Sequence, residues 1–333
     1  MKSYQPPFTV TPEILSLVVE IGEFVGRINS SSALSSSPIL RRTNRIRSIY
    51  SSLAIEQNTL SLAQVTDVLN GKRVIAPPKD IVEVKNAYEI YEHLEELDPF
   101  DVEDLLKAHG VMVRSLVDEA GQFRSGNVGV VDSQGQILHF GTLPKYIPDM
   151  LEKLLNWVKN SDVPMLIKSC VFHYEFEVIH PFSDGNGRIG RLWHTLLLSK
   201  WQPVFAYLSV ESIIHERQSQ YYEAINTSNQ QADATAFVAF MLAAIKAAIL
   251  DAIDISEAAS GMEVKPVTKD RWETIEKWLR KHKTLRNADL QTLLGISTAT
   301  ASRLLRDWTA EGRIIKERKG SYWTYRLKTD AKK

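Results

Sequence analysis

A stretch of twelve residues, His180-Pro-Phe-Ser-Asp-Gly-Asn-Gly-Arg-Ile-Gly-Arg191, joins two segments whose apolar residues recur at helical spacing. These segments cover residues 166–178 and residues 189–201. The stretch is therefore predicted to be a loop that opens onto a helix N-terminus, where free N–H groups and the helix dipole attract an anion. Gly185 and Gly187 would let backbone amides approach that anion closely.

The charged side chains of this stretch suit a phosphate ligand. Arg188 and Arg191 are three positions apart on neighbouring rows of the second helix, and both offer forked donors to phosphate oxygens. Asp184 is a hard oxygen ligand of the kind that Mg²⁺ uses together with substrate phosphates. Histidine is the side chain that titrates nearest to neutral pH, so His180 is the candidate general base. The alternative is a helix-capping loop with solvated arginines.

The stretch matches the signature of the Fic family, HxFx(D/E)GNGRxxR, at every specified position, and the chain resembles that family from about residue 40 to about residue 250. The resemblance implies transfer of a nucleotide, usually AMP, from ATP to a Ser, Thr or Tyr hydroxyl of a protein. His180 would then be the catalytic base, and Asp184 would bind Mg²⁺. The ATP phosphates would contact Gly185, Asn186, Gly187, Arg188 and Arg191. Gly187 also favours AMP transfer, because the branch that phosphorylates carries a bulkier basic residue there.

Two further regions resemble parts of that family. Residues 128–142 read as two short strands around a turn and resemble the flap, a hairpin that pairs with an extended segment of the target protein. Tyr222 and Asn229, seven positions apart on one helical face, match the adenine-side positions approximately. Helix packing is the alternative for Tyr222, and an ordinary surface hairpin is the alternative for the flap.

The segment Ser52-Leu-Ala-Ile-Glu-Gln-Asn58 resembles the inhibitory motif of the family, (S/T)xxxE(G/N). Glu56, at the end of a helix, could form a buried ion pair with Arg191 and keep it from the γ-phosphate of ATP. Gln57 departs from the pattern, since Gly would end the helix better at that position. A helix-end glutamate with a local partner is the alternative.

The chain of 333 residues, 44% of them hydrophobic, can hold two or three domains. We expect a mostly α fold: a Fic-type helical domain with a β-hairpin flap, followed by a small winged-helix (α+β) domain. The expected parts are an N-terminal helical region with the inhibitory helix (residues 1–100), a Fic catalytic domain (101–255), a linker (256–268) and a winged helix-turn-helix domain (269–333).

The C-terminal part is strongly basic although the whole chain has no net charge. Residues 265–333 hold 18 Lys and Arg against 8 Asp and Glu, so the rest of the chain is correspondingly acidic. Three helical segments and two strand-like runs resemble a winged helix-turn-helix, in which DNA bases would meet the start of the third helix. The candidate contacts are Ser297, Thr298, Thr300, Ala301 and Arg303. The alternative is a module for dimerisation or protein docking.

Composition also bears on location. Cys170 is the only cysteine, which excludes an intramolecular disulfide framework and fits a reducing compartment. The N-terminus lacks the apolar core of a signal peptide, and the apolar run at residues 236–250 is short and contains Lys246. We expect a cytoplasmic protein without a membrane partner.

The sequence leaves three functions open. The first is an autoinhibited protein adenylyltransferase that uses ATP and Mg²⁺. The second is a phosphodiesterase that removes AMP from a modified protein, with Glu56 orienting water. The third is a DNA-binding regulator whose Fic domain senses ATP. The sequence does not name the target protein, the acceptor residue or what relieves inhibition, and it leaves homodimer formation and self-modification open.

Overall fold

The computed structural model describes residues 4–30, 37–131, 137–259, 268–294, 298–319 and 322–328. The chain divides into two compact units, Met1–Lys246 and Ala247–Lys333. The first unit takes in both the expected N-terminal region and most of the expected catalytic domain, without a division near residue 100. The expected linker also differs, since helix α12 (Thr235–Ala259) continues into its first residues. Residues 260–267 of that linker lie outside the described residues.

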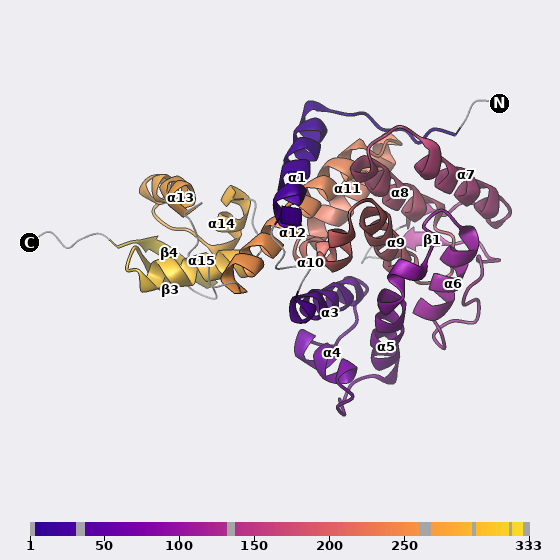
Figure 1. Cartoon of the computed structure of the whole chain (residues 1–333), viewed down its shortest axis with the longest axis horizontal. Helices are drawn as coiled ribbons and strands as arrows, with labels where there is room; N and C mark the ends of the chain where they lie inside the picture. Colours follow the sequence, from indigo (N-terminus) through magenta and orange to yellow (C-terminus); the bar gives the residue numbers. More distant parts are fainter. Residues whose placement is uncertain are drawn as a thin grey trace, which may run out of the picture. The chain divides into compact units, whose positions relative to one another are not determined.

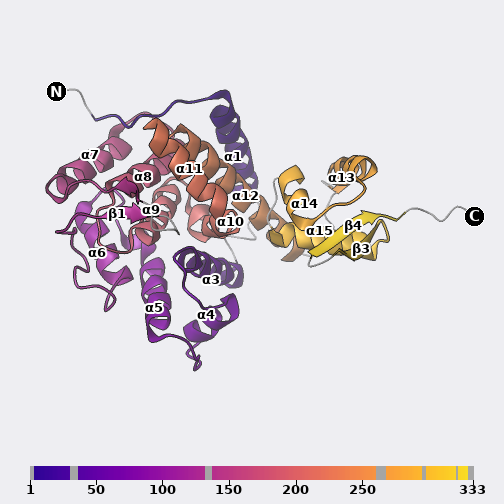
Figure 2. The ribbon, with the colours of Figure 1, turned by 180° about the vertical axis from the view of Figure 1, so that it is seen from behind.

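The first unit is built mainly from helices (Figures 1 and 2). Its complete α-helices are α1 (Pro12–Ser30), α3 (Pro38–Ile55), α4 (Leu62–Leu69), α5 (Pro78–Glu92), α6 (Val102–Met112), α7 (Ile147–Asn160), α8 (Met165–Ile179), α9 (Asn186–Trp201), α10 (Val210–Glu216) and α11 (Gln218–Gln231). Its 3-10 helices are η1 (Leu94–Glu96), η2 (Pro144–Tyr146) and η3 (Pro203–Tyr207). The mostly helical fold that the sequence predicts is confirmed.

Helices α8 and α9 form the centre of this unit. Most residues of both helices are buried, including polar and charged ones such as His173, Arg188 and Arg191. Helix α8 packs on α7 and α9, while α9 also contacts α3 and α6. The twelve-residue stretch forms the connection between α8 and α9 (residues 180–185) and the first turns of α9, so the core of the unit positions it.

Local sequence signals explain several helix ends. Ser61 and Gln64 form the capping box that begins α4, since each side chain bonds the backbone N–H of the other residue. Helix α3 begins with Pro38 at its first turn and with the Ser37 hydroxyl accepting from the Leu40 N–H. Helix α3 then packs on α5, α9 and α10, which places its last turn beside the start of α9.

The hairpin of the first unit consists of β1 (Gly129–Val131) and β2 (Ile137–Phe140), which pair antiparallel with Gly129 opposite Phe140. The two strands agree with the sequence prediction, and their connecting residues 132–136 lie outside the described residues. The base of the hairpin is fixed to the end of α8, because the Thr142 N–H donates to the Ile179 carbonyl oxygen over 3.2 Å.

Helix α12 is long and apolar enough, by length and composition alone, to cross a membrane at residues 235–254. However, 56% of its most apolar stretch is buried inside the protein. Phe237, for example, packs edge-on against His173 and lies beside Tyr221. These contacts place the start of α12 in the core of the first unit.

The second unit contains α13 (Thr268–His282), α14 (Asn287–Leu294), α15 (Thr298–Ala310), β3 (Ile314–Lys319) and β4 (Tyr322–Leu327). Strands β3 and β4 pair antiparallel, and Leu285 adds a backbone bridge to Tyr325. The core joins all three helices to β3 through Ile275, Leu279, Leu285, Leu290, Ala301, Leu304, Leu305, Trp308 and Ile314. The element order is the expected one, while the winged-helix assignment and its DNA contacts stay predictions.

Three of the predicted DNA contacts need comment. Ala301 is fully buried in the core of the second unit, so its side chain cannot meet a base, and that prediction is wrong. Ser297 lies outside the described residues. Arg303 already has an ion-pair partner, because its guanidinium lies 3.4 Å from the Asp254 carboxylate of α12. A base contact by Arg303 would have to break or share that ion pair.

Candidate active site

The loop between α8 and α9 is held in a single shape by buried contacts. His180 ends α8 in the left-handed region, with φ of 51°, and Gly185 precedes α9 with φ of 88°. Phe182 is fully buried and stacks on His109 with ring centroids 3.6 Å apart. His109 bonds the Asp184 carbonyl oxygen through Nε2 and accepts the Gly121 N–H at Nδ1. Helix α9 thus begins at Asn186, three residues before the predicted start, because Gly185 turns the chain into it.

The side chain of Asn186, one of the expected phosphate contacts, is already bonded within the loop. Its amide nitrogen donates to the Phe182 carbonyl oxygen over 2.8 Å, and its amide oxygen accepts from the Phe182 N–H over 2.9 Å. The residue is only 3% exposed. These bonds give the side chain a role in holding the loop, so a phosphate contact from Asn186 would come from its backbone.

His180 is placed to act as a base at the rim of the loop. Its Nδ1 lies 3.3 Å from the Glu177 carbonyl oxygen, and its side chain is 22% exposed. A proton on Nδ1 would be shared with that carbonyl, which leaves the lone pair on Nε2 to accept another proton. The backbone carbonyl oxygen of His180 accepts from the Arg124 Nε over 2.7 Å.

Arg124 is a buried side chain that the sequence analysis did not single out. Besides His180, its guanidinium donates to the carbonyl oxygens of Gly126 and Thr142 at the two ends of the hairpin. The Gly141 backbone is so close that an added Cβ would lie 2.7 Å from Arg124 Nη2 and 3.3 Å from the His180 Cβ. Arg124 therefore links the two ends of the hairpin to the backbone of His180, the candidate general base.

Arg188 is held by two carboxylates. Its Nη2 lies 2.8 Å from Asp184 Oδ1, and its Nη1 lies 3.2 Å from Glu83 Oε1 of α5. The Glu83 carboxylate also accepts from the Asn58 amide over 2.8 Å. Within the described part of the chain, the buried Nε of Arg188 has no hydrogen-bond partner, so this guanidinium keeps a donor for a further oxygen.

Arg191 is bound by the end of α3. Its Nη2 donates to Glu56 Oε1 over 2.8 Å and to the Ser52 carbonyl oxygen over 3.0 Å, while its Nε donates to the Ser52 hydroxyl over 3.1 Å. The Arg191 side chain is 1% exposed, whereas that of Glu56 is 36% exposed. The structure thus brings together the two segments that resemble the signature and the inhibitory motif.

Gln57 shows why Gly or Asn is usual at its position. Helix α3 ends in two reversed hydrogen bonds, from the Asn58 N–H to the Leu53 carbonyl oxygen and from the Gln57 N–H to the Ala54 carbonyl oxygen. This Schellman arrangement needs a left-handed residue after the helix, and Gln57 adopts φ of 66°. The left-handed backbone of Gln57, which follows Glu56 in this turn, is therefore sterically unfavourable.

Gly187 lies directly under the ion pair. A Cβ built on Gly187 would lie 2.3 Å from Glu56 Oε1 and 3.0 Å from Arg191 Nη1. The absence of a side chain at Gly187 is thus what lets the Glu56 carboxylate reach Arg191.

The two adenine-side candidates lie on α11 in different surroundings. Tyr222 is 42% exposed, and its pKa is raised by partial burial and by the negative charge of Glu56. Its phenol therefore lies near the ion pair. The Asn229 amide oxygen accepts from the Tyr174 hydroxyl over 3.0 Å. The adenine role of both residues stays a prediction.

Glu177 is a second functional candidate that the sequence analysis missed. Its Oε2 lies 3.9 Å from His180 Nδ1, and its Oε1 lies 3.9 Å from His173 Nε2. Burial raises the pKa of the Glu177 carboxyl to about 7, although the positive charge of Arg191 opposes the rise and the negative charge of Glu56 adds to it. A carboxyl group that titrates near neutral pH therefore lies between the candidate base and Arg191.

The residues fit a magnesium ion that is held mainly by phosphates. Among the described residues, no group of three or more His, Cys, Asp or Glu side chains could hold a metal. Asp184 is half-exposed, and its pKa is lowered because Arg188 and the Gly185 N–H outweigh the effect of burial. One ionised carboxylate beside a phosphate cradle is a common protein contribution to Mg²⁺ binding.

Comparison with known proteins agrees with this geometry. Residues 99–198 match the model of the Fic/DOC family. A crystal structure of a Fic family protein from Desulfovibrio desulfuricans G20 is 41% identical, with a TM-score of 0.74 over 99% of this chain and 100% of that chain. Fic-1 from Caenorhabditis elegans shares the fold at 23% identity, with a TM-score of 0.59 over 74% of this chain and 72% of that chain.

Curated relatives carry names that state an activity. The protein adenylyltransferase fic-1 of Caenorhabditis elegans is 29% identical over 196 residues, which are 54% of this chain and 36% of that protein. The protein adenylyltransferase Fic of Nematostella vectensis is 28% identical over 207 residues, 58% of this chain and 45% of that protein. The chain thus spans less than half of the length of either relative. Since a relative at 41% identity is covered from end to end and the motif-bearing residues match the family model, the chain belongs to the Fic family.

Proposed function

We propose that this chain is an autoinhibited protein adenylyltransferase, which transfers AMP from ATP to a Ser, Thr or Tyr hydroxyl of a target protein. The observation that carries the proposal is the loop between α8 and α9. It places a partly exposed His180 at one end and the N-terminus of α9, with two buried arginines, at the other. The names of the curated relatives support the same activity.

The reaction follows from what these groups can do. Nε2 of His180 would take the proton of the acceptor hydroxyl as its oxygen attacks the α-phosphorus. The bond from that phosphorus to the bridging oxygen breaks, and diphosphate leaves. The N–H groups at the start of α9 and the guanidinium of Arg188 would stabilise the negative charge that builds up on the phosphate oxygens. Mg²⁺ held by Asp184 would neutralise part of the charge on the phosphates.

Autoinhibition is the finer part of the proposal, and the contacts of Arg191 support it. Within the described residues, the hydrogen bonds that the Arg191 guanidinium donates go to Ser52 and Glu56. To reach that guanidinium, the γ-phosphate of ATP would have to displace the Glu56 carboxylate. A buried guanidinium without its anion is costly, which makes the paired state the stable one. ATP would then bind with its α-phosphorus out of line with His180.

The proposal is tested by transfer of label from ATP carrying radioactive α-phosphate. Purified wild type, Glu56→Gly and the double variant Glu56→Gly/His180→Ala are each incubated with Mg²⁺ and cell lysate. We expect strong labelling with Glu56→Gly, weak labelling with wild type and none with the double variant. Mass spectrometry of the labelled protein would give the transferred group and the acceptor residue.

Other outcomes distinguish the alternatives. Equal labelling by wild type and Glu56→Gly would contradict autoinhibition. Release of AMP from a modified protein by wild type, lost in Glu56→Gly, would instead indicate the phosphodiesterase, because Glu56 would then orient the attacking water. ATP binding that survives His180→Ala without any turnover by wild type or Glu56→Gly would indicate an ATP sensor.

A further inference from the structure

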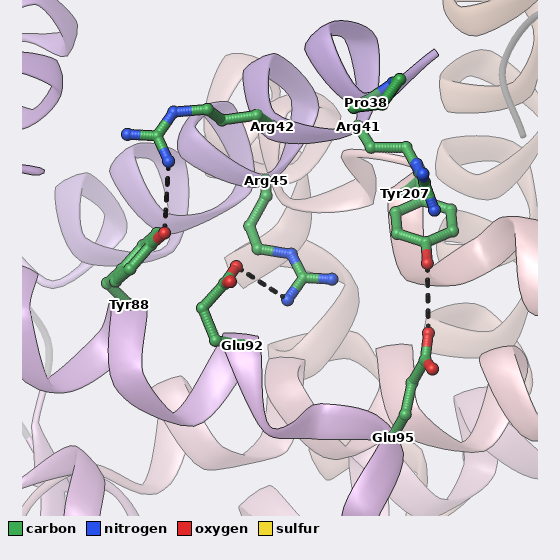
Figure 3. Close-up of a pocket in the computed structure, with 8 residues that line it drawn as sticks. All are labelled: Pro38, Arg41, Arg42, Arg45, Tyr88, Glu92, Glu95 and Tyr207. Carbon is green, nitrogen blue, oxygen red and sulfur yellow. Dashed lines mark hydrogen bonds and ion pairs between the residues drawn. The ribbon is translucent and has the colours of Figure 1, made fainter. Parts of the chain in front are cut away.

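A second group of arginines lies at the opposite end of α3 from Glu56. Arg41, Arg42 and Arg45 of the first turns of α3 line one side of a surface cavity of about 320 Å³ (Figure 3). About 1.5 Å of helix rise per residue places Arg41 roughly 20 Å from Glu56 along α3. This cavity, called the arginine–tyrosine pocket below, is therefore separate from the candidate active site.

The facing side of the pocket carries two tyrosines and two carboxylates. Tyr88 and Glu92 come from α5, Glu95 from η1 and Tyr207 from the end of η3 (Figure 3). The Tyr207 hydroxyl donates to Glu95 Oε1 over 3.2 Å. The pocket thus has a cationic side from α3 and, across from it, an aromatic side with hydrogen-bond acceptors.

Two of the three guanidinium groups lack a carboxylate partner among the described residues. Arg45 pairs with Glu92 over 3.3 Å. Arg42 donates only to neutral groups, the Tyr88 hydroxyl at 3.3 Å and the Asn70 amide oxygen at 3.1 Å. Arg41 packs over the Tyr207 ring, 5.2 Å from its centroid, and has no ion pair in the described part of the chain.

This arrangement is unfavourable for the helix without an anion. Arg41 and Arg45 are four positions apart, where like charges repel each other. Arg41 and Arg42 also lie near the positive end of the α3 dipole, and the first turn of α3 holds no acidic residue to offset them. A bound anion would relieve both effects, and forked guanidinium donors match phosphate oxygens best.

The opposite side limits what else the ligand carries. Glu92 and Glu95 would repel a second anionic group, but they accept hydrogen bonds from hydroxyl or amino groups. The ring of Tyr88 offers a flat apolar surface to a planar ring, whereas the Tyr207 ring is already covered by Arg41. A cavity of about 320 Å³ is large enough for a small ligand of this composition.

We propose that the arginine–tyrosine pocket binds a nucleoside phosphate, with its phosphate on Arg41 and Arg42 and its sugar or base towards Glu92 and Glu95. The ligand would occupy the first turns of the same helix that ends at Glu56. The proposal does not depend on transfer activity, because binding to this pocket requires no turnover.

Calorimetric titration of the full chain with AMP, without Mg²⁺, tests the proposal. We expect AMP to bind wild type, and Arg41→Ala/Arg42→Ala to bind it at least about tenfold more weakly, since each charge-assisted hydrogen bond contributes roughly that factor. Arg42→Gln, which keeps most of the side-chain length, should also weaken binding. Arg73→Ala, an exposed arginine outside the pocket, is the matched control and should bind as wild type does.

Three results would overturn the proposal. They are an AMP affinity unchanged by both pocket variants, no detectable AMP binding to wild type, and inorganic phosphate binding as tightly as AMP. The last would make the pocket a simple anion site. Thermal melting without ligand checks that the variants fold, and removing like charges should leave the melting temperature unchanged or raise it.

Discussion

Arg191 and Glu56 form an ion pair of 2.8 Å although they are 135 positions apart in the chain. The pair is asymmetric, because the Arg191 side chain is 1% exposed while the Glu56 side chain keeps 36% of its surface in contact with solvent. Arg191 is fixed by Ser52 and by the packing of α9, so Glu56 is the partner that can move. Under the proposed autoinhibition, release of the site would require movement at the end of α3 and would leave the motif in place.

Gln57→Gly should stabilise the protein. Gln57 holds a left-handed backbone with φ of 66°, which Gly adopts without steric cost. We expect the free energy of unfolding, measured by urea denaturation, to rise by about 1 kcal/mol. This value already allows for the entropy that Gly adds to the unfolded chain. Gln57→Ala is the control and should show no such gain. A destabilised Gln57→Gly protein would contradict the Schellman ending of α3.

Gly187→Ala should separate Glu56 from Arg191. The new Cβ would come within 2.3 Å of Glu56 Oε1, and that half-exposed carboxylate is the group able to yield. A double-mutant cycle of unfolding free energies tests this. Glu56→Gln should lower the free energy of unfolding by about 1 kcal/mol in the wild-type background and should hardly change it in the Gly187→Ala background. Equal costs in the two backgrounds would show that the pair tolerates the added methyl group.

Glu177 should make stability fall as the pH rises towards neutrality. Its carboxyl has a pKa of about 7 in the folded protein against an ordinary value of 4.5. The folded state therefore binds the proton more tightly than the unfolded state. The resulting stabilisation is complete below pH 4.5 and is lost as the pH passes through about 7.

Glu177→Gln should remove this dependence, because the amide stays neutral. The free energy of unfolding of the variant relative to wild type should rise by about 2 kcal/mol between pH 5 and pH 7, as followed by urea denaturation. Parallel curves for the two proteins over that range would mean that Glu177 is already ionised in the fold. Glu152→Gln, which replaces an exposed glutamate of α7, is a suitable comparison.

Removal of residues 265–333 tests the DNA prediction. That segment holds 18 Lys and Arg against 8 Asp and Glu, so we expect the full chain to retard duplex DNA in a gel at low salt and to lose this on addition of salt. The shortened chain should cause no retardation while still binding ATP with Mg²⁺. Absence of retardation by the full chain at low salt would favour dimerisation or protein docking for the second unit.

The parts of the site that carry a motif could be predicted from the sequence. The stretch from His180 to Arg191 joins two helices as expected, although α9 already begins at Asn186, and Glu56 lies beside Arg191 as the inhibitory motif suggested. The hairpin strands also agree with the prediction. Each of these depends on residue types at fixed spacing, which are visible in one sequence.

Glu83, Arg124 and Glu177 could not be predicted in the same way. Each is a single polar residue in a segment without a motif, and its partners are brought close only by the packing of distant elements. Asn186 was in the motif, but its bonds to Phe182 depend on the turn of the loop. Sequence shows which groups are present; the assignment of donors to acceptors depends on the fold.

The buried Arg124 has a consequence for the choice of the acceptor residue. One guanidinium bonds both ends of the hairpin and the carbonyl oxygen of His180, which ties the hairpin to the backbone of the candidate base. A target strand that pairs with this hairpin would therefore have a fixed position relative to His180. A shift of one residue along that strand turns every side chain to the other face. The register in which an extended target segment pairs with the hairpin would therefore determine which of its residues faces His180.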